Sequence, residues 1–95
     1  STEIAIDGKA AARKNYFEQK EREREIKRRQ KRVDICESEI SDIERQIQDV
    51  ENRLAAGGEL PPDIYEQHSM LNKKLENAMS AWELACNDLE AIKQE

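Results

Sequence analysis

Two segments of this chain carry apolar residues at alternating steps of three and four, and this spacing constrains the fold more than any other feature. The first repeat consists of Ile26, Val33, Cys36, Ile40, Ile43, Ile47, Val50 and Leu54. The second consists of Ile64, His68, Leu71, Leu75, Ala78, Trp82, Ala85, Leu89 and Ile92. Such a repeat aligns side chains in one narrow stripe along a helix, the packing seam of a coiled coil. Arg29 is the position that interrupts the first seam.

Residues 57–62, between the two repeats, contain two glycines and two prolines. Gly57 suits the left-handed conformation that commonly follows a helix end, and the prolines prevent simple continuation of the helix. So short a connection favours antiparallel helices whose seams pack together. We therefore predict an all-α fold, a two-helix antiparallel coiled-coil hairpin over 13–95. Its predicted parts are a linker from a preceding domain (1–12), a helix (13–56), a connector (57–62) and a second helix (63–94).

Folding about the connector also predicts which residues meet. The expected neighbours are Leu54 with Ile64, Ile47 with Leu71, Ile43 with Leu75, and Cys36 with Trp82, which is expected to be the large knob of the seam. The second helix should end opposite Ile26, so the first should project two or three turns further and carry Tyr16 and Phe17. Cys86 lies beside the seam and is not expected to oppose Cys36, so both should be free thiols. His68 is interpreted as a packing or register-setting residue.

Composition narrows the class of protein. Charged residues make up 39% of the chain and aromatic residues 4%, which is typical of long helices. The sequence shows no signal-peptide core and no membrane span. It shows no phosphate-binding glycine loop, nucleophile elbow or His-Glu-x-x-His motif, and its two cysteines and one histidine do not make a zinc site. We expect a soluble, cytoplasmic, non-catalytic chain with no catalytic, cofactor-binding or metal residues.

Charge is divided along the chain. Residues 13–32 hold ten Lys or Arg against four Glu, a net +6, whereas residues 33–95 hold five against fifteen acids, a net −10. Within the basic segment, four cations recur at steps of 4, 3 and 4 and share one outward helix face, which is a typical footprint for phosphate. The predicted nucleic-acid contacts are Lys20, Arg24, Lys27, Arg28, Lys31 and Arg32.

An alternative interpretation of the same segment is a mixed-charge, solvated face. In it the glutamates pair along the helix, for example Glu18 with Arg22 and Glu23 with Lys27. If nucleic acid does bind, base identity is expected to matter little, because no aromatic stacking platform accompanies the cations.

The order of features also resembles a known family. A basic leading helix is followed by Glu37, Ile40, Ile43-Glu44, Ile47, Val50-Glu51 and Leu54-Ala55, and then by a Gly/Pro connector. After the connector come Tyr65, Leu71, Leu75, Met79, Trp82-Glu83-Leu84 and Leu89-Glu90. Over about residues 13–92 this is similar to the C-terminal coiled-coil domain of ABC-F ATPases.

The resemblance implies a parent protein with two tandem nucleotide-binding domains and no membrane spans, which acts on ribosomes in translation or antibiotic protection. Some relatives' tails are linked to DNA binding. ATP and Mg²⁺ would belong to the parent, and no residue of this chain is assigned to them. The implied partners are ribosomal RNA, tRNA or DNA. The hairpin itself is predicted to be a monomer, because each seam can pack against the other, and a dimer is the rival arrangement. The alternative function is a purely structural spacer or a protein-docking module.

Overall fold

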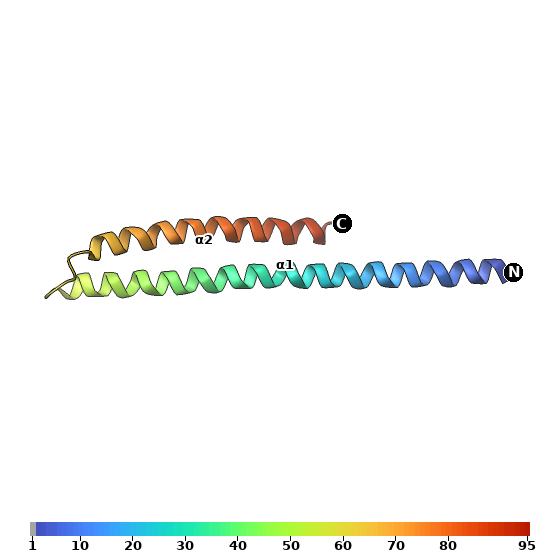
Figure 1. Ribbon diagram of the computed structural model, residues 1–95, viewed down its shortest axis with the longest axis horizontal. Helices are drawn as coiled ribbons and strands as arrows, with labels where there is room; N and C mark the ends of the chain where they lie inside the picture. Colours follow the sequence, from blue (N-terminus) through green and yellow to red (C-terminus); the bar gives the residue numbers. More distant parts are fainter. Residues whose placement is uncertain (1) are drawn as a thin grey trace.

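The chain forms two long antiparallel helices that lie side by side (Figure 1). The computed structural model describes the backbone of residues 2–95 and the side chains of residues 8–95. Helix α1 spans Thr2–Ala56 and α2 spans Ile64–Lys93. Together they make a rod of 86 × 15 × 15 Å. The predicted all-α helical hairpin is confirmed.

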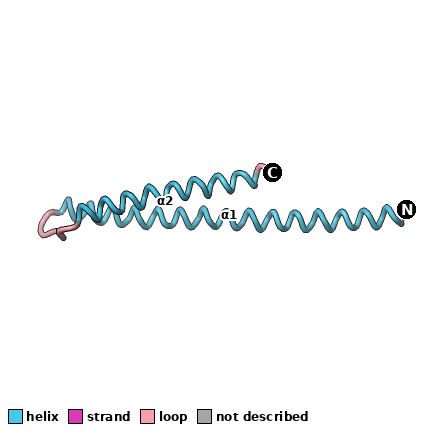
Figure 2. Tube along the Cα trace, turned by 45° about the horizontal axis from the view of Figure 1, so that its top comes forward, coloured by secondary structure: helices cyan, strands magenta, loops and turns pink. Residues whose placement is uncertain are grey.

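Helix α1 begins earlier than the sequence predicted. Residues 2–12 are helical and continuous with the rest of α1, where a linker was expected. Ala10, Ala11 and Ala12 have the highest helix propensity of any residue, and no proline interrupts the stretch. As a result α1 continues well past the C-terminal end of α2 (Figure 2). The projecting part, residues 2–21, is called the N-terminal arm and is about 30 Å long at about 1.5 Å per residue.

The connector turns the chain through two left-handed glycines. Gly57 and Gly58 have φ values of 72° and 84°, which residues with a Cβ atom rarely adopt. The backbone N–H of Ile64 then donates to Pro61 O at 3.2 Å, and α2 begins. Ile64 itself is only 2% exposed, so the first residue of α2 is anchored in the core beside the turn. The left-handed residue predicted at Gly57 is confirmed.

Contacts between the helices follow the predicted register. Trp82 Nε1–H donates to Glu37 Oε2 at 3.3 Å, one residue from the predicted neighbour Cys36. Near the connector, His68 Nε2 lies 3.1 Å from Glu51 Oε1. At the other end, Ile26 packs against the same apolar cluster as Ile92. That cluster is built on Val33, Cys36, Ala85, Leu89 and Ile92, with Ile26, Trp82 and Cys86 packed against it.

Burial along the seam is uneven because two helices cover each other on one side only. Ala78 and Ala85 are buried, and their small side chains permit close approach of the helices. Several larger seam residues are only half-buried: Ile40, Ile43, Ile47, Leu71, Leu75 and Trp82. Trp82 is therefore not the fully enclosed knob that its spacing suggested. Its ring packs against the cluster, while its N–H reaches the exposed Glu37.

Both cysteines are free thiols. Cys36 is buried in the apolar cluster, and Cys86 is half-buried and packs against that same cluster. Desolvation by burial, followed by the negative charges of Glu37, Cys36 and Glu90, raises the pKa of the Cys86 thiol. The two free thiols predicted from the sequence are confirmed.

Candidate nucleic-acid interface

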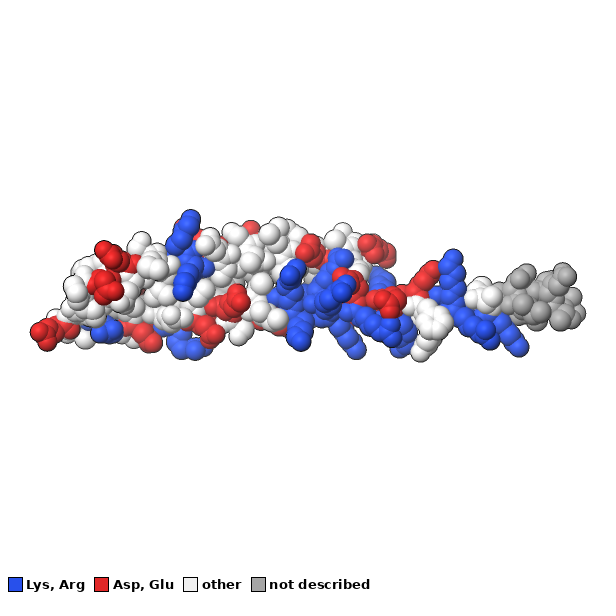
Figure 3. Space-filling model, in the orientation of Figure 1, with Lys and Arg blue, Asp and Glu red and all other residues white. Residues whose placement is uncertain are grey.

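The six predicted contact residues all lie on α1 and are all solvent-exposed. Four of them, Lys20, Arg24, Lys27 and Lys31, form the outward stripe of α1, which is called the basic face. Arg28 and Arg32 lie beside it. In the space-filling view, Lys and Arg side chains gather over the part of the rod where α2 comes to its end (Figure 3). This part of the surface is the candidate site.

Two further arginines, Arg22 and Arg29, occupy positions in the seam and reach across to the backbone of α2. Arg22 Nη2 donates to the carbonyl oxygens of Ile92 and Lys93 at 3.4 and 3.3 Å. Arg29 Nη1 donates to Asp88 O at 2.7 Å. Ile92 and Lys93 belong to the last turn of α2, whose carbonyls lack the next helical turn as a partner and carry the negative end of the dipole, so the Arg22 guanidinium is a favourable neighbour there. Arg29 binds one turn earlier, at a carbonyl inside the helix.

This arrangement explains why the first seam is interrupted where it is. An apolar residue at position 29 would pack against the last turns of α2, whereas an arginine can bind their backbone directly. The sequence marked Arg29 only as a break in the pattern and missed its role. A usable signal was present, since two arginines stand in seam positions opposite the predicted end of the second helix.

Three of the six predicted residues form ion pairs within α1. Lys20 Nζ lies 3.3 Å from Glu23 Oε2, Arg24 pairs with Glu21, and Arg28 pairs with Glu25. Most of these groups are well exposed, and such pairs contribute little stability. A phosphate group can therefore replace the glutamate at small cost.

The pairs proposed for the solvated-face interpretation are not the ones that form. Glu18 lies 4.0 Å from Lys14, while the Arg22 guanidinium is directed to the end of α2. Glu23 pairs with Lys20 and not with Lys27.

The other three predicted residues, Lys27, Lys31 and Arg32, form no ion pair among the side chains of residues 8–95. Lys27 and Lys31 are one turn apart on the basic face, and Arg32 follows directly. Their charges are not neutralised by a neighbouring carboxylate, so they are the strongest available attraction for a polyanion on this surface.

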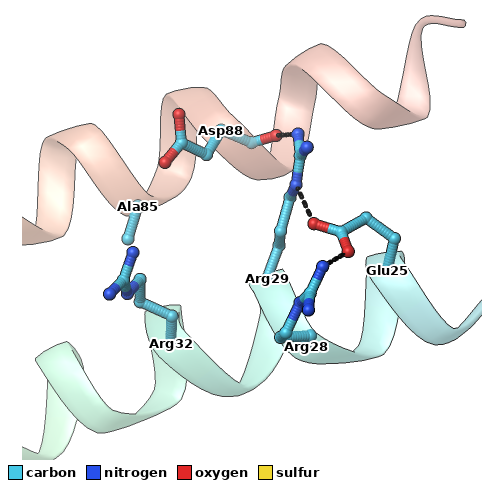
Figure 4. Close-up of a pocket in the computed structure, with 6 residues that line it drawn as sticks. All are labelled: Glu25, Arg28, Arg29, Arg32, Ala85 and Asp88. Carbon is cyan, nitrogen blue, oxygen red and sulfur yellow. Dashed lines mark hydrogen bonds and ion pairs between the residues drawn. The ribbon is translucent and has the colours of Figure 1, made fainter.

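Beside the basic face, an open cavity of about 420 Å³ lies between the helices. Its lining is formed by Glu25, Arg28, Arg29 and Arg32 from α1 and by Ala85 and Asp88 from α2 (Figure 4). Glu25 Oε1 accepts from Arg29 Nε at 2.8 Å and its other oxygen pairs with Arg28, whereas the Arg32 guanidinium points toward Ala85. The small side chain of Ala85 leaves this space open.

Guanidinium groups recognise phosphate with parallel hydrogen bonds, and three of them converge on the cavity. The candidate site therefore extends from the outward basic face round to the groove between the helices. Because Glu25 already holds two of the arginines, Arg32 is the cavity residue best placed to bind an incoming anion.

Comparison with family models, with curated proteins and with solved structures finds no match to this chain. Neither helix, over the residues described, has a stretch long and apolar enough to cross a membrane. The described residues also include no group of three His, Cys, Asp or Glu side chains placed to hold a metal ion.

Proposed function

We propose that this hairpin is a non-catalytic, nucleic-acid-binding accessory domain. The observation that carries the proposal is the group of unpaired cations Lys27, Lys31 and Arg32 beside an arginine-lined cavity, on a molecule whose remaining surface is acidic. Phosphate backbones are bound by such surfaces largely independently of sequence. The expected partners are ribosomal RNA, tRNA or DNA.

The order of sequence features further supports a place for the hairpin as the C-terminal coiled-coil domain of an ABC-F type ATPase. In that setting the protein is cytoplasmic, the ribosome is its expected site of action, and ATP and Mg²⁺ are bound by the parent's nucleotide-binding domains. The hairpin would supply a rigid arm that reaches the nucleic acid.

The dimensions suit several phosphate contacts. From Lys20 to Arg32, α1 rises about 18 Å at about 1.5 Å per residue. One strand of duplex DNA presents a phosphate about every 3.4 Å along its axis. Four to six phosphates can therefore lie along the surface, and the logarithm of affinity should fall with the logarithm of salt with a slope of roughly −3 to −5.

The test compares two triple charge reversals. Changing Lys27, Lys31 and Arg32 to Glu should weaken binding to labelled tRNA and duplex DNA at least tenfold, measured by fluorescence anisotropy. It should also reduce the size of the salt slope by about 2 to 3. The same change in net charge at Arg45, Lys73 and Lys74, which are exposed but remote from the site, is the control and should have a much smaller effect.

Circular dichroism of both variants should remain helical, because none of the six changed positions lies in the seam. Co-sedimentation with ribosomes extends the comparison to the expected cellular partner. Equal losses in the two variants would mean that net charge alone drives binding. Unchanged binding in the first variant would mean that the basic face is a solvated surface.

A structural spacer or protein-docking module is the alternative function. It is favoured by a second groove of about 310 Å³ between the helices, lined by Glu37, Ile40, Ser41, Met79 and Trp82. Met79 is exposed and Trp82 only half-buried, so apolar surface is accessible there. Under this alternative, the charge reversals at Lys27, Lys31 and Arg32 leave the domain's role intact.

A further inference from the structure

Two aromatic residues are exposed on the N-terminal arm, where no part of α2 covers α1. Tyr16 is 59% exposed and Phe17 is 65% exposed. Their ring centroids are 5.8 Å apart with an interplanar angle of 75°, so the rings form an edge-to-face pair. Lys20 Nζ lies 5.6 Å from the centroid of the Tyr16 ring. A cation of the basic face is therefore in contact with the aromatic pair.

The aromatic pair is continuous with the candidate interface. Tyr16 stands one turn before Lys20 and two turns before Arg24, so the basic face extends through Tyr16 on the same side of the helix. Arg13 and Lys14, both exposed, lie on the other side of the pair. The sequence expectation that no aromatic platform accompanies the cations did not take account of this pair beside Lys20.

We propose that Tyr16 and Phe17 are a stacking platform for unpaired bases of a nucleic acid whose phosphates run along the basic face. This inference rests on the proposed function and names its substrate class, which is single-stranded or looped nucleotides. Every base presents a π-face to an aromatic ring, so stacking tolerates any sequence. Bases inside a duplex are already stacked on their neighbours, so the platform discriminates against fully paired partners.

A second copy of the chain fits this surface less well than a nucleic acid does. Between the residue before the aromatic pair and the end of α2, the seam positions are Asn15, Gln19 and Arg22, so residues 15–22 present no apolar stripe to a partner helix. Arg13, Lys14 and Lys20 lie within four residues of the rings, and the cations of the basic face follow them along α1. These cations favour a polyanion that carries flat apolar groups.

The test changes both rings to leucine, which favours helix and keeps apolar bulk. Tyr16→Leu with Phe17→Leu should weaken binding to single-stranded oligonucleotides about tenfold per stacked base, while binding to duplexes of equal length stays unchanged. Tyr65→Leu is the matched control, because Tyr65 is 71% exposed but lies beside the connector, at the far end of α2. It should leave both affinities unchanged. RNA and DNA versions of each oligonucleotide show which backbone is preferred.

A direct readout accompanies the affinities. Irradiation of the complex with an oligonucleotide that carries 5-iodouridine should cross-link the peptide containing Tyr16 and Phe17, as identified by mass spectrometry. Equal losses on single strands and duplexes, or no loss at all, would overturn the stacking platform and leave the proposed function standing. If the unaltered chain binds no nucleic acid, both proposals fail. If the leucine variant converts a dimer into a monomer in sedimentation, the pair is a self-association surface and the inference is wrong.

Discussion

At the scale of single residues, Cys86 shows how a position beside the seam acquires its chemistry from the opposite helix. Its own helix contributes Glu90 as a neighbouring negative charge, while Glu37 and Cys36 belong to α1. Burial is the largest cause of the raised pKa, and the three negative groups add to it. All four effects disfavour the thiolate, which is the reactive form.

We predict that Cys86 reacts with iodoacetamide more slowly in the folded chain than in guanidinium at any pH below the raised pKa of its thiol. Because the folded pKa is raised, this group contributes stability below the unfolded pKa of the thiol, and the contribution is lost as pH rises through the folded pKa. The reaction rates should therefore converge at higher pH. Mass spectrometry of the alkylated peptides measures each site.

Cys36 provides an internal comparison because it is buried. It should react more slowly than Cys86, since its burial limits access of the reagent. Both cysteines should be alkylated fully in denaturant without reductant. If both cysteines stay unalkylated under those conditions, they form a disulfide, and the prediction of free thiols is wrong.

At the scale of the elements, the end of the hairpin opposite the connector is held together partly by arginines of α1 that bind the backbone of α2, where apolar packing would be usual. The last turns of α2 are held by Leu89 and Ile92 in the core and by Arg22 and Arg29 at the backbone. Hydrogen bonds from charged donors contribute about 1.5–3 kcal/mol when well formed. Partial exposure reduces this figure here, since water competes for both partners.

We predict that replacing Arg22 and Arg29 together by Ala lowers the free energy of unfolding by about 1–2 kcal/mol and loosens the last turns of α2. Urea unfolding measures the first effect, and amide hydrogen exchange over residues 88–93 measures the second. Arg24→Ala is the control, because Arg24 pairs only with the exposed Glu21 and should cost under about 0.5 kcal/mol. Exchange that is equal in all three chains would show that the core cluster alone holds the end of α2.

At the scale of the whole molecule, the hairpin is a rod whose two ends differ in charge and in whether α2 lies beside α1. The connector end is acidic and made of paired helices. Toward the other end lies the basic segment 13–32, and beyond the end of α2 the single helix α1 carries the exposed rings. We expect the seams of α1 and α2 to pack against each other within one chain, so that the molecule is a monomer. The rival arrangement is an extended parallel dimer.

Spin labels at Lys27 and Ala91, the exposed neighbours of Ile26 and Ile92, distinguish these states in a chain whose own cysteines are replaced by alanine. The hairpin should give a short distance that persists when labelled chains are diluted with unlabelled ones. In an extended helix the two labels of one chain would be on the order of 100 Å apart, at about 1.5 Å per residue. A short distance that disappears on dilution would indicate contact between chains.

The sequence by itself determined the two helices, their antiparallel packing and their register. Coiled-coil pairing depends on a periodic stripe and a turn, and both are local features of the chain. For this reason Cys36 could be placed near Trp82, and Ile26 near Ile92, before any coordinates were known. The concentration of cations on one face of α1 was predicted on the same grounds.

Which groups are covered, and which cations reach the other helix, depends on the tertiary structure. Arg22 binds the last carbonyls of α2 and Arg29 binds the carbonyl of Asp88 one turn earlier, and both contacts depend on where the second helix stops beside the first. Trp82 is half-buried because a two-helix rod has no third element to enclose it. By contrast, the lack of ion pairs at Lys27, Lys31 and Arg32 among the described side chains follows from local spacing. Glu23, one turn before Lys27, is bound by Lys20, and no glutamate stands three or four residues from Lys31 or Arg32.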